Sequence, residues 1–296
     1  MTAPAVPTNV IEPRRSVARH LVELWTYREL LANLVRKELK VKYKNSTLGF
    51  AWSLLNPAML MVVYTIVFQI VLGAGIPYFP IYLLSGLLAW NLFSSSLAGG
   101  TNSITGNHTL VNKVYFPREI LPLAAVGANC VHFLLQATVL LATIAISPVN
   151  FDLAWLWMVI PAIVVLLIWA STLAVFLSAL NVYARDTQHL LELALLAWIW
   201  MTPIIYPWLL PAEKLEANGM SSGLLMVNPM VSVVTTMQRA LYGLRTAKGY
   251  DAPILPLEGQ WWYLRNLGIT GAVGIVLFIL AMRYFNRVEG DFAEEL

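Results

Sequence analysis

Residues 52–72 read WSLLNPAMLMVVYTIVFQIVL, a run without a charged side chain. A helix of roughly 20 mostly apolar residues is long enough to cross the hydrocarbon core of a bilayer. The run is part of a longer one, because no aspartate, glutamate, lysine or arginine occurs between Lys44 and Lys113. A stretch rich in glycine and proline, residues 73–80, divides it. The sequence therefore predicts two membrane-spanning helices, over residues 52–72 and 81–103.

The composition of all 296 residues indicates a lipid-facing surface. Hydrophobic residues make up 58% and charged residues 12%, against about 45–50% and about 25% in soluble proteins. Such a composition excludes a disordered chain. A net charge of +3 is too small for a nucleic-acid module, so no nucleic-acid partner is expected. The single cysteine, Cys130, excludes an internal disulfide scaffold and a thiolate metal cage.

Four further charge-free runs complete the predicted membrane domain. They cover residues 120–147, 155–182, 193–210 and 267–282. In the run over 193–210, Pro203 and Pro207 are expected to bend the end of the helix. The sequence thus predicts an all-α polytopic membrane protein with six transmembrane helices.

The positions of the lysines and arginines predict the orientation in the membrane. Of the 19, 14 lie in the N-terminal segment, the 104–119 loop, the 183–190 loop and the C-terminal segment. Loops rich in lysine and arginine stay in the cytoplasm, so both termini are expected there. The first 24 residues lack an apolar core of the kind found in signal peptides, so no cleaved signal is expected.

The chain outside the spans divides into a few predicted parts. Residues 1–16 are expected to be a disordered cytosolic tail, 17–48 an amphipathic helix in the cytosolic interface, and 291–296 an acidic cytosolic tail. In the amphipathic helix Leu24, Tyr27, Leu31, Leu34 and Val35 share one face, which is expected to lie in acyl chains.

The cations of this helix have two interpretations. They are Arg36, Lys37, Lys40, Lys42 and Lys44. In the first interpretation they only fix the topology. In the second, some of them also hold an anionic lipid-linked substrate or an adjoining cytosolic subunit.

Two cytosolic connections carry candidate docking residues. The loop 106–119 contains Lys113, Val114, Tyr115, Phe116, Pro117, Arg118 and Glu119. Exposed apolar side chains on such a loop favour a docking surface; the alternative is that Tyr115 and Phe116 pack against the helix ends of the same chain. In the turn 181–187, Arg185 and Asp186 either pair with a partner or cap the following helix, and the sequence alone favours capping.

The external segment, residues 207–260, contains a charge-free stretch over 223–238 that is only 16 residues long. This is short for a span, so it predicts a re-entrant or interfacial helix pair, broken at Asn228-Pro229. The pair would either gate a pathway or form a rigid cap.

Several kinds of chemistry have no signature in the sequence. There is no GxxxxGK[ST] run for nucleotide phosphates, the histidines show no metal-ligand spacing, and the aspartates are not paired. No catalytic residue, metal site or bound cofactor is therefore expected. The six predicted spans contain no ionisable aspartate, glutamate, lysine or arginine, whereas ion-coupled transporters keep such a group at membrane depth. Energy for transport would have to come from another subunit.

The spans instead carry aromatic and small side chains. Trp52, Asn56, Leu60, Tyr64 and Phe68 recur every four residues in the first span, as do Trp198, Thr202 and Tyr206 in the fifth. Each aromatic fits an interfacial belt or helix packing, but as two stripes they would also suit a pathway for sugars. Small residues predict close helix crossings; they are Ala98, Gly99, Gly100, Gly268, Gly271 and Gly274.

Two longer motifs resemble a known family. Residues 36–57, RKELKVKYKNSTLGFAWSLLNP, and residues 113–122, KVYFPREILP, are similar to ABC-2-type permeases that export polysaccharides. Arg185-Asp186, the segment PIIY at 203–206 and Asn228-Pro229 ahead of Arg239 extend the resemblance, which covers residues 20–290. It makes residues 49–290 an ABC-2 transmembrane domain in a bacterial inner (plasma) membrane.

The resemblance implies a homodimer with two separate cytosolic P-loop ATPase subunits, which bind ATP and magnesium. The substrate would be a polyprenyl-diphosphate-linked glycan of the O-antigen, teichoic acid or cell-wall galactan type, and the first motif favours galactan. The resemblance makes the 110–119 loop the coupling helix that enters the ATPase, together with Arg185 and Asp186. It places the first and fifth spans around the channel and makes 207–245 the outer gate.

Two rival functions are compatible with the residues alone. An ATP-independent flippase or secondary exporter would work without nucleotide. A membrane enzyme acting on a polyprenyl carrier would change the lipid covalently.

Overall fold

The computed structural model describes residues 26–44, 46, 49–114, 116–148, 152–249 and 251–295. Within these residues the chain is helical and contains no strand. The predicted tail 1–16, residues 17–25 of the predicted interface helix, and Tyr115 lie outside the described residues. The helices are α2 (Arg28–Tyr43), α3 (Ala51–Tyr64), η1 (Thr65–Val71), α4 (Phe79–Thr101), η2 (Thr105–Asn107), α5 (His108–Lys113), α6 (Ile120–Ile146), α7 (Leu153–Leu156), α8 (Val159–Tyr183), α9 (Thr187–Trp200), α10 (Leu209–Ala217), η3 (Ser222–Val227), α11 (Pro229–Leu241), α12 (Gln260–Val288), η4 (Glu289–Asp291) and α13 (Phe292–Glu295).

Five helical stretches are long and apolar enough to cross a membrane. They are Ala51–Val71, Phe79–Thr101, Ile120–Ile146, Leu153–Tyr183 and Gln260–Asp291, and they match five of the six predicted spans. In the first, α3 continues directly into a seven-residue π-helix, η1. No feature of the sequence analysis anticipated this change of helix type.

The remaining predicted span, residues 193–210, is only partly helical. Helix α9 ends at Trp200 and is 14 residues long, or about 21 Å, which is shorter than the roughly 30 Å hydrocarbon core. The predicted bend is confirmed, because residues 201–206 are not helical and Pro203 has no N–H to continue the ladder. The count of six spans stays a prediction.

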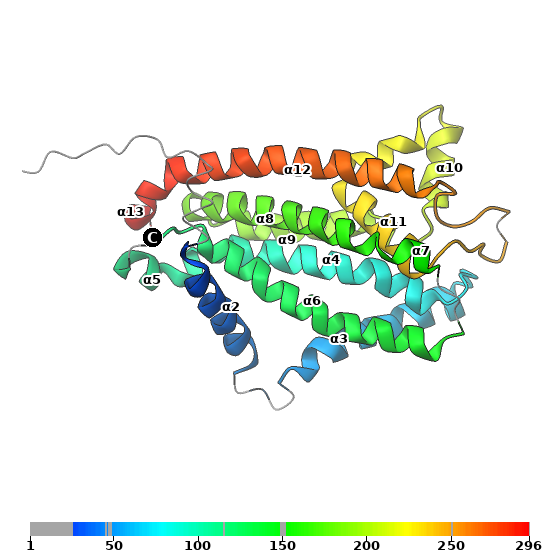
Figure 1. Ribbon diagram of the computed structural model, residues 1–296, viewed down its shortest axis with the longest axis horizontal. Coiled ribbons are helices and arrows are strands. Elements are labelled where there is room, and N and C mark those ends of the chain that lie inside the picture. The colour runs from blue at the N-terminus through cyan, green and yellow to red at the C-terminus, as the bar shows by residue number, and fades with distance from the viewer. Residues whose placement is uncertain are drawn as a thin grey trace, which may run out of the picture.

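Helix α4 is the centre of the bundle (Figure 1), since it is largely buried and packs against α6, α8 and α11.

Glycines allow the helices of this bundle to cross closely. A Cβ atom at Gly100 would lie 2.5 Å from Cβ of Ala174 in α8, whereas one at Gly99 would lie 3.5 Å from Cβ of Ala125 in α6. In α12, Gly271 and Gly274 contact α8 in the predicted way. The prediction is wrong for Gly268, which has open space around it.

The two neighbouring glycines of α4 provide a matched test. Gly100→Ala forces α4 and α8 apart, which we expect to cost about 1–3 kcal/mol and to lower the melting midpoint of the detergent-purified chain by several degrees. Gly99→Ala adds its methyl group at an ordinary contact distance and should leave the midpoint unchanged. Equal midpoints for the two variants in thermal-shift measurements would contradict this account of the crossing.

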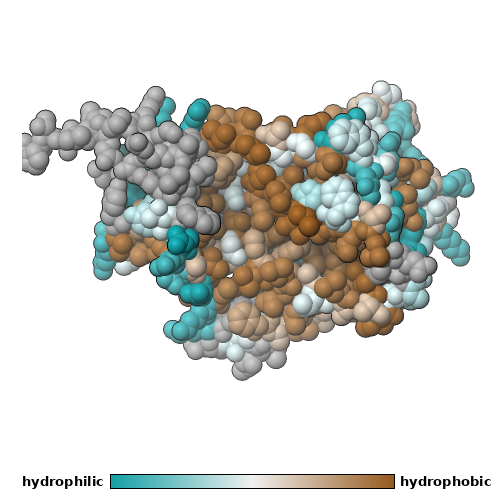
Figure 2. Space-filling model, viewed as in Figure 1, coloured by the Kyte–Doolittle hydropathy of each residue, from teal (hydrophilic) through white to brown (hydrophobic). Residues whose placement is uncertain are grey.

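The surface is divided into an apolar belt and two hydrophilic ends (Figure 2). We call the end that carries α2, α5 and α13 the basic end, and the end that carries α7 and α10 the distal end (Figure 1). Many large apolar side chains in the belt are exposed, among them Val63 and Ile70 of the first span and Leu193 and Leu196 of α9. This surface is what a lipid-facing protein requires.

Helix α2 packs against α6, so its predicted contact with acyl chains is wrong for the apolar face that the structure describes. Leu34 is buried, and Leu31 and Val35 contact the same cluster of apolar residues. The close approach depends on Gly127 of α6, where a Cβ atom would lie 2.9 Å from Cγ2 of Val35.

The distal end confirms the predicted break at Asn228-Pro229. The 3-10 helix η3 ends just before Asn228, whose side-chain oxygen accepts a hydrogen bond from the N–H of Met230 at the start of α11. All 13 residues of α11 are buried, and the helix packs against α4, α8 and α12. The guanidinium of Arg239 lies 3.7 Å from the ring centroid of Trp155. A gating role for this segment stays a prediction.

Candidate functional site

The loop after α5 has an exposed edge and a buried anchor. Asn112, Lys113 and Val114 are exposed, whereas Phe116 and Glu119 are buried. Phe116 belongs to the apolar cluster that contains Val111 and Ile120. The prediction of an exposed aromatic docking surface is therefore wrong for Phe116, because its ring packs against helices of its own chain. Among the residues of this loop that the structure describes, Val114 is an exposed apolar one.

Arg118 joins this loop to the C-terminal segment. Its guanidinium donates a hydrogen bond to the backbone oxygen of Glu289 and lies 5.9 Å from the ring centroid of Phe292. Phe292 is fully buried, with its ring edge-on to those of Phe285 and Tyr183 at 5.4 Å and 6.1 Å. The described part of the predicted acidic tail is thus held, through Phe292, against the two connections that were predicted to be cytosolic.

The second connection, the turn 181–187, has an exposed charged pair. Arg185 and Asp186 are exposed. Asp186 occupies the N-cap position of α9, but its side chain makes no capping hydrogen bond. The interpretation that Asp186 caps α9 with its carboxylate is therefore wrong.

Helix α2 is tied to the loop that precedes α5. The amino group of Lys37 donates a 2.6 Å hydrogen bond to Oδ1 of Asn107, and Leu34 shares the apolar cluster of Val111 and Phe116. One small core, which we call the basic-end cluster, therefore joins α2, the 104–119 loop, α6, α8 and the C-terminal helices α12 and α13. Its buried members are Leu34, Ile104, Val111, Phe116, Ile120, Leu121, Ala124, Val175, Ala179, Val182, Met282, Phe285 and Phe292.

The predicted phosphate-binding cations fall into different environments. Lys37 is bound to Asn107, and Arg36 donates to Oδ1 of Asn33 at 3.2 Å. Lys40, Lys42 and Lys44 are all exposed. Of these, Lys42 lies at a cavity that the structure describes, and partial desolvation there lowers the pKa of its amino group below the usual value.

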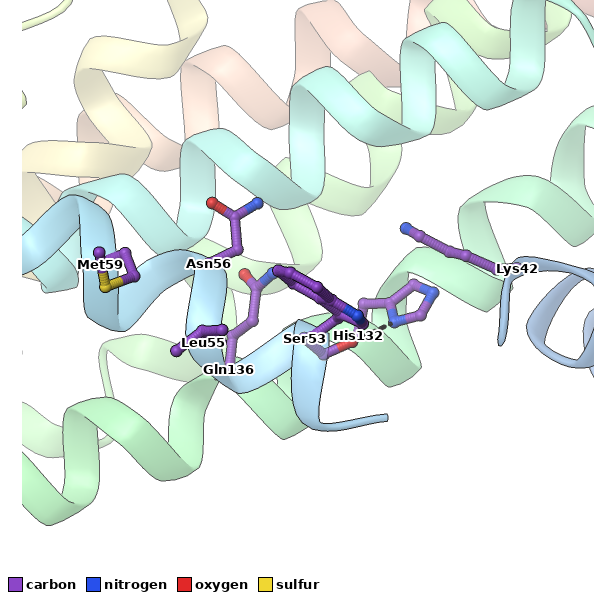
Figure 3. A pocket seen from close by; sticks show the side chains of 8 residues that line it. Lys42, Ser53, Leu55, Asn56, Met59, His132 and Gln136 are labelled. Carbon is purple, nitrogen blue, oxygen red and sulfur yellow. Dashed lines mark hydrogen bonds between the residues drawn. The ribbon is translucent and has the colours of Figure 1, made fainter. Parts of the chain in front are cut away.

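That cavity is a groove of about 410 Å³ between α2, α3 and α6. Lys42 lies at one edge and Met59 at the other (Figure 3). Between them lie Asn56 of α3 and Gln136 of α6, and the hydroxyl of Ser53 lies 3.2 Å from Nδ1 of His132. Trp52, predicted to line a channel, also lines this groove.

The rest of the first stripe packs toward the core. Leu60, Tyr64 and Phe68 contact the main apolar cluster, and the ring of Phe68 stacks on that of Phe79 in α4 at 6.2 Å. The first stripe is therefore divided, with Trp52 and Asn56 on the groove and the aromatic rings beyond them against α4.

The second stripe is held in a hydrogen-bonded network. The indole N–H of Trp198 donates to Oδ1 of Asn228 at 2.8 Å, and Nδ2 of Asn228 donates to Oγ1 of the buried Thr202 at 3.0 Å. Tyr206 donates its hydroxyl proton to the backbone oxygen of Trp200. Trp198 also packs edge-on against Phe93 of α4. Both stripes thus contact α4.

Four residues that shape these sites were missed by the sequence analysis as functional residues. His132 was expected only not to bind a metal, Asn228 was expected only to break the external helix pair, and Gln136 and Phe292 have no predicted role. A signal existed for the first two, because two polar side chains four residues apart in a charge-free span share one helix face. The positions of Asn228 and Phe292 depend on contacts between segments far apart in the sequence, so no local pattern indicates them.

An apolar belt and long apolar helices are typical of an integral membrane protein. Comparison with known proteins agrees. A family model described as ABC-2 type transporter matches residues 29–213. The O-antigen export system permease protein RfbA of Myxococcus xanthus is 34% identical over 276 residues, which cover 93% of this chain and 98% of that protein. A protein of the same name from Klebsiella pneumoniae is 29% identical over 268 residues, or 90% of this chain and 95% of that one.

The chain belongs to the ABC-2 type transporter family and is a multi-pass protein of a bacterial membrane.

Proposed function

We propose that the chain is the permease subunit of an ABC exporter that moves a polyprenyl-diphosphate-linked polysaccharide out of the cytosol. The observation that carries the proposal is the likeness to an O-antigen export permease over 93% of this chain. In this proposal the chain is not catalytic and binds no cofactor. ATP and magnesium are bound by two copies of a separate cytosolic P-loop ATPase.

The basic end faces the cytosol in this proposal, in accordance with its excess of lysine and arginine. The ATPase binds the exposed edge of the α5 loop, at Lys113 and Val114, and the exposed Arg185-Asp186 turn. Movement of the ATPase passes to the spans through the basic-end cluster, because Phe116 and Phe292 fix both connections to the ends of α6, α8 and α12.

The glycan path lies between two copies of the chain. The outer face of α9 exposes large apolar side chains, including Leu190, Leu193 and Leu196, and a second copy has room to pack there. The aromatic rings of Phe68 in the first span and Trp198 in α9 pack on α4 of their own chain, so they line such a path only if they move away from α4. Thr202 reaches such a path only if the 201–206 segment moves.

The type of glycan is proposed from the relatives. Their names support an O-antigen-type polysaccharide. The preference for galactan, which the first motif suggests, stays a prediction.

The test begins with the tagged chain and the P-loop ATPase that co-purifies with it. We expect the complex in vesicles to move lipid-linked glycan only with ATP and an intact ATPase. A hydrolysis-deficient ATPase is the control. Transport by the chain without nucleotide would favour the flippase or secondary exporter, and covalent change of the lipid by the chain alone would favour the enzyme.

A further inference from the structure

The groove between α2, α3 and α6 contains an unusual set of polar side chains for its position. Ser53 and Asn56 belong to the first span, and His132 and Gln136 to the span formed by α6. Polar side chains in a span are costly unless they have partners or a function. The Ser53–His132 contact engages one pair, but the space beside Asn56 and Gln136 is open (Figure 3).

The depth of the groove is set by helix α2. Val35 of α2 contacts α6 at Gly127, and His132 follows five residues later, about 8 Å further along the helix. If α2 lies at the membrane interface, the groove lies just below it, where a lipid phosphate and the group attached to it are found.

From this geometry we infer that the groove binds a glycosyl phosphate, the phosphate and first sugar of the lipid carrier. This inference rests on the proposed function and specifies which part of the substrate is recognised. Lys42, the cation at the edge of the groove, binds the phosphate. The indole face of Trp52 packs on the C–H face of the sugar ring, and the amides of Asn56 and Gln136 bond to its hydroxyl groups.

The exposed face of the first span provides a place for the carrier's tail. Leu55 and Met59 line the groove, and Val62, Ile66 and Ile70 continue from them along the same side of the first span. All of them are exposed and apolar. An isoprenoid chain fixed by its phosphate at Lys42 would lie along this row.

An ordinary anionic phospholipid would use only part of this site. It would bind Lys42 and the apolar row but would leave Trp52 and Gln136 unused. The sugar is therefore the feature that distinguishes the two ligands.

The test measures binding to the full chain in phosphatidylcholine nanodiscs. The probes are a polyprenyl diphosphate that carries one N-acetylglucosamine or one galactose, and the same diphosphate without sugar. We expect the chain to prefer a sugar-bearing probe. Trp52→Leu and Gln136→Leu should each reduce that preference roughly fivefold, the effect of one lost stacking or hydrogen-bonding contact. Lys42→Gln should weaken the binding of all the probes by the same factor.

Matched controls lie on the same helices. Lys40→Gln removes an exposed cation outside the groove, and Thr138→Val changes a polar side chain of α6 whose hydroxyl bonds only within its own helix; both should bind like the unaltered chain.

The inference is overturned if the unaltered chain shows no preference for the sugar-bearing probe, or if Gln136→Leu and Trp52→Leu retain that preference. It is also overturned if Lys40→Gln and Lys42→Gln weaken binding of the probes equally. Competition by phosphatidylglycerol as strong as that by the sugar-bearing probe would overturn it too. ATP-dependent export by the complex is measured in parallel. Export without a sugar preference overturns only this inference, whereas absence of export overturns the proposed function.

Discussion

Replacement of Val114 by aspartate is expected to abolish ATP-dependent export while leaving the permease folded. Val114 is 50% exposed, so the substitution should change the stability of the chain by no more than about 0.5 kcal/mol. In the complex, however, a carboxylate would be buried against the ATPase. An unpaired charge in such an interface costs about 3 kcal/mol, which weakens association roughly 100-fold.

The measurement is the amount of ATPase retained by the tagged permease, together with export in vesicles. Val114→Thr is the control, because it keeps the shape of the side chain without a charge. Full ATPase retention and export by Val114→Asp would show that this loop is not the docking surface. Loss of both in Val114→Thr as well would indicate a folding defect instead.

The second large effect is expected at Phe292. Phe292→Ala removes a fully buried ring that contacts Phe285, Tyr183 and Arg118. A change from phenylalanine to alanine in a core costs about 3–5 kcal/mol. The lost stability is local to the basic-end cluster, so we expect amide hydrogen exchange over 116–119 and 183–187 to become roughly 100-fold faster. The long helices of the bundle should keep their protection.

Phe292→Leu is the matched control, since it retains most of the apolar volume and should exchange nearly as slowly as the unaltered chain. Unchanged exchange in Phe292→Ala would mean that the C-terminal segment does not hold these connections. Faster exchange throughout α4 and α8 would mean that the substitution unfolds the bundle rather than its basic end.

The membrane-spanning helices were predictable because their signal is local. A charge-free run such as 120–147 has few alternatives to a transmembrane helix, and the structure places α6 there. Proline likewise acts through its own backbone, so the end of α9 before Pro203 and the start of α11 at Pro229 were both foreseen. The π-helix η1 was not, because it has no comparable residue signature.

The sites were less predictable because they depend on which way a side chain points. Phe116 and Val114 are two residues apart in one loop, yet one is buried and the other exposed. Neither periodicity nor composition separates them. The same holds for α2, whose apolar face would suit lipid or protein equally, and the contacts that bury it come from residues far away in the sequence, such as Gly127.

If the groove binds the carrier and the α5 loop binds the ATPase, the basic-end cluster would link the two binding events thermodynamically. Leu34 anchors α2, whose end forms the edge of the groove, and Phe116 anchors the loop proposed to bind the ATPase, and both side chains belong to one cluster. If the carrier lipid shifts α2, it shifts the loop as well. Linkage is reciprocal, so a carrier that raises the affinity for the ATPase must itself be bound more tightly by the same factor when the ATPase is present. With coupling of this sign, the permease would bind its lipid carrier most tightly while the ATPase is bound.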